Sequence, residues 1–169
     1  MKHMLFLVPL CVIIGALLAC GASDTNTGTS TTPSANTPTT SKHFTVGETV
    51  KVGDTWQVVV NSVKTNAGDQ FVKPTKGTFV VVNISLKNIS SKEQNLSSML
   101  GFKFKGTDGT AYNETYLTGA APSPNGKVEA GGITRGDLVY DVPTDQKSFT
   151  LAFSPDTFSG GQTIWDVKL

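Results

Sequence analysis

The chain has 169 residues, with 14 Lys and Arg against 13 Asp and Glu, and a formal net charge of +1. This length holds one ordinary domain plus short extensions, which excludes a large multidomain enzyme. Only 16% of the residues are charged, against about 25% in a typical globular domain. The sequence has no run of Lys or Arg, and nucleic-acid binding needs clustered basic residues. We therefore expect no nucleic-acid partner.

The first twenty residues have the layout of a secretory signal. Lys2 is followed by a run at 4–18 that is apolar apart from Pro9, and then by small residues. This run is shorter than the roughly 20 apolar residues that a bilayer-spanning helix needs. The letters LLACG at 17–21 resemble the bacterial lipobox, in which the cysteine is acylated and the chain is cut just before it. We predict a signal peptide at 1–19, cleavage between Ala19 and Cys20, and lipid attachment at Cys20.

A second interpretation is ordinary signal cleavage after Ala22, with Cys20 and Ala22 as the small residues of the cleavage site. We favour the lipid anchor because a polar tether directly follows Cys20 and because the cysteine then has a role. Under this interpretation Cys11 leaves with the signal, so the mature chain has no cysteine pair and no disulfide. The expected location is the extracytoplasmic face of the cell membrane.

A low-complexity segment follows the cysteine. Residues 21–41 contain eight Thr, four Ser, two Pro and no large apolar side chain. Such a segment cannot bury enough surface to offset its conformational entropy. We predict a flexible linker at 20–43, with a root-mean-square span of roughly 25 Å.

From residue 44 to 169 the sequence alternates apolar and polar residues in short stretches between Gly, Asn, Asp and Pro. This period of two is typical of strands, and no stretch sustains the 3.6-residue period of a helix. A first strand is predicted at 56–63. The longest is predicted at 78–88, where Val80, Val82, Ile84 and Leu86 share one face, and should be a central core strand.

Further strands follow by the same alternation. Phe102 and Phe104 are predicted to point inward, and Asp108 with Gly109 is a hairpin signal before the short strand at 111–112. In the later strands, Leu138, Tyr140 and Val142 are predicted to share one face, and Phe149, Leu151 and Phe153 follow the same rule. A final strand is predicted at 163–169, with Ile164 and Trp165. Arg135, Asp137 and Asp141 are expected on a wetter face.

These elements predict an all-β fold, an immunoglobulin-like antiparallel β-sandwich of about seven to nine strands at 44–169, preceded by a signal segment and a disordered tether. The Cys, Trp, Cys spacing of antibody domains is absent, so the likeness to immunoglobulins is architectural.

Three stretches carry a family resemblance: KGTFVVVNISLKN at 76–88, DGTAY at 108–112, and AG at 130–131 followed by GDLVYDVP at 136–143. Over about 44–169 the chain resembles a bacterial lipoprotein family of unknown function related to the mycobacterial immunoprotective extracellular antigen. The resemblance implies a signal or anchor, a low-complexity linker and one immunoglobulin-like sandwich. Ala130 stands where the family commonly has Pro, which loosens that turn. The resemblance implies no activity and no catalytic residues.

Sequence motifs for catalysis or metal binding are scarce in this chain. The nucleophile-elbow motif G-x-S-x-G is absent, and His43, the last histidine, is predicted to be a solvated linker residue. Too few His, Cys and Met remain after processing for a transition-metal site. Asp108 is read as a turn residue, while Glu114 nearby leaves a weak calcium site open. We predict no catalytic residue, no metal site and no cofactor.

Two long loops stand out as candidates for contact with a ligand. The loop at 113–132 carries Tyr116 and Leu117, and its length exceeds the roughly 12 to 15 residues of ordinary loops. The loop at 64–77 carries Phe71 near Lys73 and Lys76, an aromatic residue beside basic groups. The alternative, which we favour somewhat, is that Phe71 and Tyr116 fold back over the open ends of the sandwich.

These observations predict a lipid-anchored binding or interaction module without catalytic activity, whose partner is an unknown protein, glycan or small ligand. One alternative is an envelope hydrolase that uses convergent carboxylates, since strands distant in sequence can bring such groups together. Another alternative is a structural accessory subunit of a membrane complex.

Overall fold

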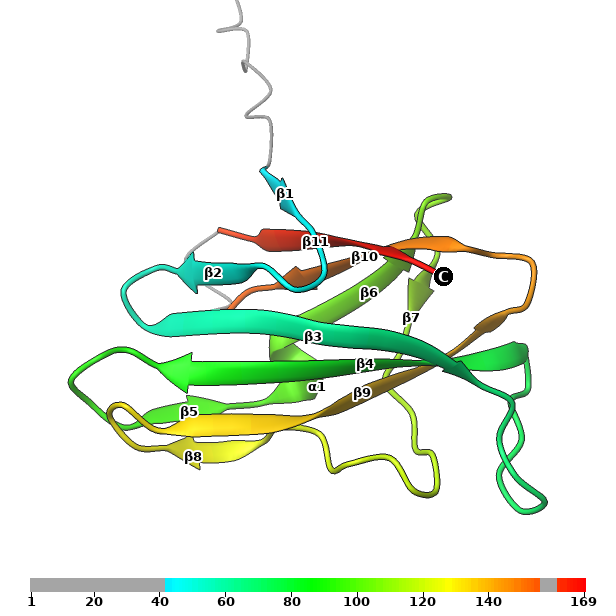
Figure 1. The fold of residues 1–169 in the computed structure, drawn as a ribbon, viewed down its shortest axis with the longest axis horizontal. Coiled ribbons are helices and arrows are strands. Elements are labelled where there is room, and N and C mark those ends of the chain that lie inside the picture. Colours follow the sequence, from blue (N-terminus) through cyan, green and yellow to red (C-terminus); the bar gives the residue numbers. More distant parts are fainter. Residues whose placement is uncertain (1–41, 156–160) are drawn as a thin grey trace, which may run out of the picture. The chain divides into compact units, whose positions relative to one another are not determined.

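A computed structural model describes residues 42–155 and 161–169 of the chain (Figure 1). The predicted signal peptide, the predicted lipid-attachment residue Cys20 and the tether up to residue 41 lie outside the described residues. Among the residues that are described, no helix is long and apolar enough to cross a membrane.

Two larger β-sheets and one small ribbon contain the strands of the described chain. The four-stranded sheet has the order β2 (Thr49–Val52), β3 (Trp56–Asn66), β4 (Gly77–Asn88) and β9 (Ile133–Pro143). The five-stranded sheet has the order β1 (His43–Phe44), β11 (Thr163–Lys168), β10 (Ser148–Phe153), β6 (Phe102–Gly106) and β7 (Ala111–Tyr112). The ribbon pairs β5 (Gln94–Leu96) with β8 (Gly126–Val128), and the one-turn helix α1 (Ser98–Gly101) follows β5.

Alternation along the strands builds one core between the two sheets. In β4, Val80, Val82, Ile84 and Leu86 are fully buried, as predicted for a central strand, and β3 and β9 flank it (Figure 1). The main cluster of buried side chains draws on both larger sheets. Burial of one such aliphatic side chain contributes about 1.5–3 kcal/mol, so this cluster is the main source of stability.

Aromatic rings join the two sheets at the centre of this core. The ring of Phe104 in β6 stacks on that of Tyr140 in β9, with centroids 4.2 Å apart and an interplanar angle of 10°. On the other side it lies 4.9 Å from the ring of Phe149 in β10. Burial, together with the nearby Glu114 carboxylate, raises the pKa of Tyr140 far above its ordinary value. Tyr140 therefore acts as a neutral core residue.

The predicted all-β sandwich is confirmed, and the two larger sheets contain nine strands, within the expected number. The predicted hairpin is also confirmed, because β6 and β7 pair antiparallel around Asp108 and Gly109, and Gly109 has a φ of +86°. Three details differ from the prediction. The pair β1–β11 is parallel, the ribbon adds two strands, and α1 is a helical turn within the all-β chain.

His43 corrects one expectation. It was predicted to be a solvated linker residue, yet it lies in β1 and pairs in register with Ile164 of β11. Its Nδ1 lies 2.7 Å from Oδ1 of Asp166, also in β11. The reason is that His43 and Phe44 together extend the edge of the sheet by pairing with β11, a long-range pairing that linker composition does not show.

Candidate functional site

The loop at 67–76, which joins β3 to β4, is held in a defined shape by its own polar groups. Oδ1 of Asp69 accepts hydrogen bonds from the backbone N–H groups of Phe71 and Val72, both at 2.7 Å. These two bonds, with a smaller contribution from the Thr118 hydroxyl, hold the pKa of Asp69 below its ordinary value. Gly68 has a φ of +78°, and a Cβ at this position would lie 2.2 Å from the carbonyl oxygen of Val72. The loop is therefore compact and needs glycine at this turn.

The far end of the same loop is fastened to β9 by Asp141. Its Oδ2 accepts hydrogen bonds from the backbone N–H and the hydroxyl of Thr75, both at 2.6 Å, and its Oδ1 lies 3.1 Å from the N–H of Lys76. Partial burial raises the pKa of Asp141, but these hydrogen bonds outweigh it, and the net pKa lies below the ordinary value. The carboxylate is thus a clamp between the loop and the sheet.

The loop at 113–125 runs along β9 and is bonded to it at several points. The backbone N–H of Thr115 donates to the carbonyl of Val139 at 2.8 Å, and that of Ala121 donates to Oδ2 of Asp137 at 2.8 Å. The hydroxyl of Ser123 donates to the carbonyl of Asp137 at 3.0 Å and also bonds to Glu114. This part of the predicted 113–132 loop is therefore docked on the sheet.

Close approach of this loop to β9 depends on a glycine in the strand. A Cβ placed on Gly136 would lie 2.0 Å from the carbonyl oxygen of Pro122 and 3.0 Å from Cδ of Pro124. Any side chain at this position would push the loop away from the strand. Gly136 thus fixes the distance between the 113–125 loop and the sheet.

A second, smaller hydrophobic cluster joins the two loops on the outer face of the four-stranded sheet. Its buried members are Phe79 of β4, Val139 of β9 and Leu117 of the 113–125 loop. Val72 of the 67–76 loop and Ala120 pack against it. The two loops that the sequence singled out therefore meet over one region of the sheet, and we call this region the two-loop surface (residues 67–76 and 113–125).

The predicted contact residues Phe71 and Tyr116 point away from the core. Their exposed fractions are 82% and 71%, so the alternative that they cover the ends of the sandwich is wrong. Their neighbours in sequence, Val72 and Leu117, supply the packing instead. The two-loop surface therefore presents two exposed aromatic side chains on loops that are fixed from beneath.

The prediction of Leu117 as a contact residue is wrong. Its exposed fraction is 4%, because it fills the space between Phe79 and Val139. The expectation that the outer face of β9 is exposed to solvent is only partly correct. Val139 lies between Asp137 and Asp141 on that face and is buried under the loop. Reading β9 by itself could not show that a distant loop covers its outer side.

The two predicted lysines occupy different environments. Lys73 is exposed and lies two residues after Phe71 in the sequence. The Nζ of Lys76 lies 5.0 Å from the ring centroid of Tyr112 in β7, within the range of a cation–π contact. Lys73 is thus a candidate for contact with a partner, while Lys76 joins the loop to the other sheet.

A hollow of about 350 Å³ lies at the edge of the two-loop surface. A polar chain crosses the sheet beside it. Nδ2 of Asn61 donates to Oδ1 of Asn83 at 2.9 Å, and Nδ2 of Asn83 donates to Oδ1 of Asp137 at 2.6 Å. Both oxygens of Asp137 are therefore engaged, one by Asn83 and one by Ala121. The hollow is lined by Lys64, Thr65, Asn66, Val81, Leu117, Thr118, Gly119, Ala120 and Asp137.

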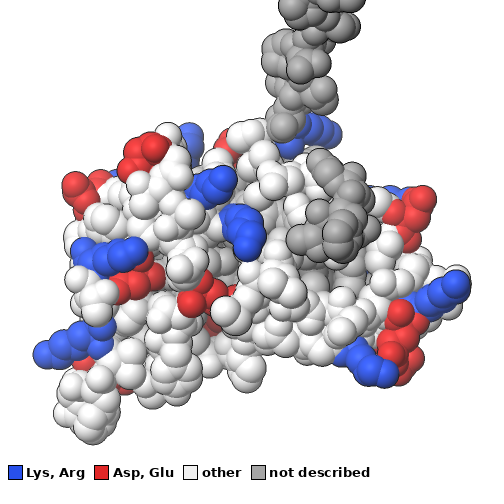
Figure 2. Space-filling view, turned by 180° about the vertical axis from the view of Figure 1, so that it is seen from behind, with Lys and Arg blue, Asp and Glu red and all other residues white. Residues whose placement is uncertain are grey.

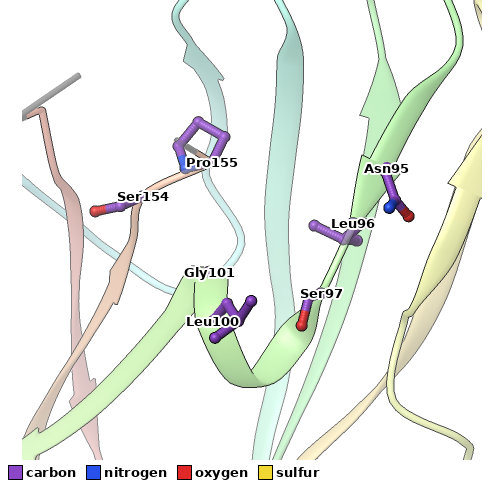
Figure 3. Close-up of a pocket in the computed structure, with 7 residues that line it drawn as sticks. All are labelled: Asn95, Leu96, Ser97, Leu100, Gly101, Ser154 and Pro155. Carbon is purple, nitrogen blue, oxygen red and sulfur yellow. The ribbon is translucent and has the colours of Figure 1, made fainter. Parts of the chain in front are cut away.

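Another pocket, of about 180 Å³, lies between α1 and the end of β10 (Figure 3). The side chains of Leu96 and Leu100 flank it, and Leu100 is 68% exposed. Its wall ends at Pro155, where the described residues stop, and we assign it no ligand. Its lining residues are Asn95, Leu96, Ser97, Leu100, Gly101, Ser154 and Pro155.

Groups suited to metal binding do not gather among the described residues. No three His, Cys, Asp or Glu side chains at 42–155 and 161–169 are placed to hold a metal ion. The oxygens of Asp108, near the residues considered for calcium, accept hydrogen bonds from the N–H and hydroxyl of Thr110. Asp137 and Asp141, the carboxylates of β9, hold the two loops. Figure 2 shows Lys and Arg interspersed with Asp and Glu on the described part of the rear face.

Comparison with known protein families shows to which family the chain belongs. The model of a domain of unknown function, DUF4352, matches residues 44–164. The chain belongs to the DUF4352 family. This confirms the resemblance drawn from the sequence motifs. No curated protein matches the chain.

Solved structures similar to this DUF4352 chain share its fold. A Bacillus subtilis protein described as "a putative lipoprotein (ycdA)" is 19% identical with a TM-score of 0.59, over 72% of this chain and 38% of that one. An uncharacterized β-sandwich protein from Clostridium difficile is 15% identical with a TM-score of 0.51, over 76% and 96%. The secreted Mycobacterium tuberculosis protein MPT63 is 13% identical with a TM-score of 0.54, over 76% and 98%. This chain therefore spans well under half of the ycdA structure but nearly all of the other two.

Proposed function

We propose that this DUF4352 protein is a binding module held on the extracytoplasmic face of the membrane by a lipid on Cys20, without catalytic activity, and that it contacts its partner through the two-loop surface. The observation that carries the proposal is the exposure of Phe71 and Tyr116, 82% and 71%, on loops that hydrogen bonds and packing hold in place. Aromatic side chains dominate binding energy at interfaces, and ordered loops lose less entropy on binding.

The chemistry of this surface favours a protein partner. Two exposed aromatic side chains can insert into apolar pockets, while the exposed Lys73 of the same loop as Phe71 can contact an acidic rim. Among the described residues, the carboxylates of Asp69, Asp137 and Asp141 hold the two loops through hydrogen bonds, and Glu114 bonds to Ser123 through one of its oxygens. This occupation also supports a role without catalysis, since these groups are structural clamps.

Site-specific cross-linking tests the contact surface. A photoreactive benzoylphenylalanine is placed at position 71 or 116 of the full-length protein in its own bacterial envelope, with position 99 as the control. Met99 is also apolar and 69% exposed, but it lies on α1. We expect one discrete product of the same size from positions 71 and 116, and none from 99. Equal labelling from all three positions contradicts the proposal.

The lipid anchor has its own test. Cells are fed an alkyne-bearing fatty acid, and the protein is examined for label by click chemistry, with Cys20→Ser as the comparison. Labelled wild-type protein and unlabelled variant are expected because Cys20 supplies the thiol of the LLACG motif. Unlabelled wild-type protein in the culture medium contradicts the anchor. The description of ycdA as a putative lipoprotein and of MPT63 as a secreted protein supports an envelope or extracellular location.

A further inference from the structure

The outer face of the four-stranded sheet contains a second hollow, away from the exposed aromatic residues. Its volume is about 220 Å³. We call it the sheet-face hollow. It is lined by Gln57, Val59, Asn61, Ser85, Lys87, Ile133 and Arg135.

Strand register brings two cations to this hollow. Lys87 of β4 pairs with Ile133 of β9, and Ser85 of β4 pairs with Arg135 of β9. Lys87 and Arg135 are therefore diagonal neighbours on one face, where Cα atoms are about 7–8 Å apart. Two like charges this close repel each other, so an anion placed between them is attracted to both.

No carboxylate of the described chain forms an ion pair with either of these two cations. At 42–155 and 161–169, neither Lys87 nor Arg135 has a carboxylate oxygen within 4.0 Å. The same-face carboxylate of Asp137 is two residues from Arg135, but its oxygens already accept bonds from Asn83 and Ala121. Lys51, at the outer edge of the same row of residues, is paired with Asp54 at 2.9 Å.

Neutral groups complete a lining that suits an anion. Ser85 Oγ accepts a hydrogen bond from Nδ2 of Asn61 at 2.8 Å, so its own hydrogen is available to donate. The Gln57 amide adds two further N–H donors. Val59 and the 55% exposed Ile133 form an apolar wall next to these donors. The hollow therefore combines two cations, polar donors and an apolar side, and no carboxylate lines it.

We infer that the sheet-face hollow binds a small organic anion, with a carboxylate or phosphate between Lys87 and Arg135 and a short apolar body against Val59 and Ile133. Arg forms bidentate hydrogen bonds with both kinds of anion, and Lys adds a point charge. This site goes beyond the proposed protein contact, because it uses other residues of the same sheet. Failure of either proposal leaves the other standing.

Titration with matched aromatic compounds tests the site. The full-length protein in uncharged detergent is titrated with benzoate and phenyl phosphate, and with benzamide and benzylammonium as neutral and cationic controls, while backbone amides are followed by NMR. Saturable shifts at Ser85, Lys87 and Arg135 are expected for the two anions alone. Equal shifts with benzamide or benzylammonium overturn the inference.

Charge variants separate this site from general surface charge. Arg135→Gln and Lys87→Gln should each weaken phenyl phosphate binding at least about tenfold, since charge-assisted hydrogen bonds contribute about 1.5–3 kcal/mol. Arg135→Lys should retain part of the affinity. The control Lys105→Gln makes the same charge change on the exposed face of β6, in the other sheet, and should leave affinity unchanged. All these side chains lie outside the core, so each variant should fold normally. An unchanged melting temperature of each variant confirms this.

Two results overturn the inference at this stage. One is an equal loss of affinity in Lys105→Gln and Arg135→Gln, which indicates attraction to net charge only. The other is binding to phosphatidylglycerol vesicles with no saturable binding of either soluble anion. That result assigns Lys87 and Arg135 to a membrane surface instead of a small-molecule site.

Discussion

Asp141 and Thr75 are 66 residues apart in the sequence, yet one carboxylate oxygen of Asp141 accepts both the backbone N–H and the hydroxyl of Thr75 at 2.6 Å. This pair fastens the 67–76 loop to β9. The exposed ring of Phe71 thus stands on a loop whose two ends are both fixed, one by Asp69 and one by Asp141.

Removal of the Asp141 clamp should loosen the loop with little damage to the sandwich. In Asp141→Ala we expect hydrogen exchange at the amides of Thr75 and Lys76 to become at least tenfold faster, because both lose their acceptor. The free energy of unfolding should fall by about 1 kcal/mol, as expected for half-exposed hydrogen bonds. Asp145→Ala removes the same charge from an exposed position and serves as the control. Unchanged exchange at Thr75 in Asp141→Ala contradicts the clamp.

Acid should release the 67–76 loop before it unfolds the core. The pKa values of Asp69 and Asp141 are lowered by folding, so both groups stabilise the loop at pH above the ordinary Asp value of about 3.9. That contribution is lost as the pH falls through the lowered values. Hydrogen exchange, corrected for its intrinsic pH dependence, should show the amides of Phe71 and Val72 losing protection below about pH 4, while Val82 stays protected. Loss of protection at the amides of Phe71, Val72 and Val82 at the same pH contradicts this prediction.

Adjacent residues of the 113–125 loop should respond oppositely to truncation. Leu117→Ala removes a buried member of the second cluster and should cost about 2–3 kcal/mol of unfolding free energy. Tyr116→Ala removes an exposed ring and should change it by no more than about 0.5 kcal/mol. Urea titration of both variants measures the difference. Similar costs for the two substitutions contradict the observed burial.

Gly136→Ala should displace the 113–125 loop from β9. The added Cβ would meet backbone atoms of Pro122, which cannot rotate away, so a cost of about 1–3 kcal/mol is expected. Loss of NMR signals that connect Thr115 with Val139 reports the displacement directly. Gly109→Ala is the matched control for added volume, because a Cβ there meets no atom of the described chain within 4 Å, although the positive φ of Gly109 adds a local strain of its own. Preserved contacts between Thr115 and Val139 in Gly136→Ala count against the proposed packing.

Asn88 at the end of β4 should be one of the most sensitive polar positions. It is fully buried, and its Nδ2 lies 2.7 Å from the carbonyl of Lys92 and 2.9 Å from that of Val128. Asn88→Ala removes these hydrogen bonds and also the acceptor of the Ser90 N–H from a buried site, at a cost of at least about 2 kcal/mol. Asn95→Ala, at an exposed position, should change stability little. Thermal melts of the two variants measure the contrast.

Strand prediction succeeded where burial is one-sided and the partners are adjacent. In β4 the alternation from Val80 to Leu86 determines which face meets the other sheet, because a shift of one residue would expose the whole apolar set. Asp108 and Gly109 identify the β6–β7 hairpin for a similar reason, since the turn conformation is local.

Prediction failed where distant segments cover one another. Leu117 and Tyr116 are both large residues in a turn-rich stretch, and the sequence contains no local signal of which one packs against Val139. The two neighbouring cations of the sheet-face hollow could not be predicted from the sequence either, because Lys87 and Arg135 become neighbours only through the β4–β9 register. The exposure of Phe71 also depends on Asp69, whose side chain closes the turn beneath it.

The parallel pairing of β1 with β11 has a mechanical consequence for a protein pulled from its N-terminal side. Tension applied ahead of residue 42 acts first on the two-residue strand β1, where His43 and Phe44 pair with Ile164 and Trp165. A strand of two residues has few hydrogen bonds to break, so we expect it to detach before the long strands β3, β4 and β9 bear the load. Detachment of β1 would lengthen the N-terminal tether by a few ångströms while the rest of the sandwich stays folded.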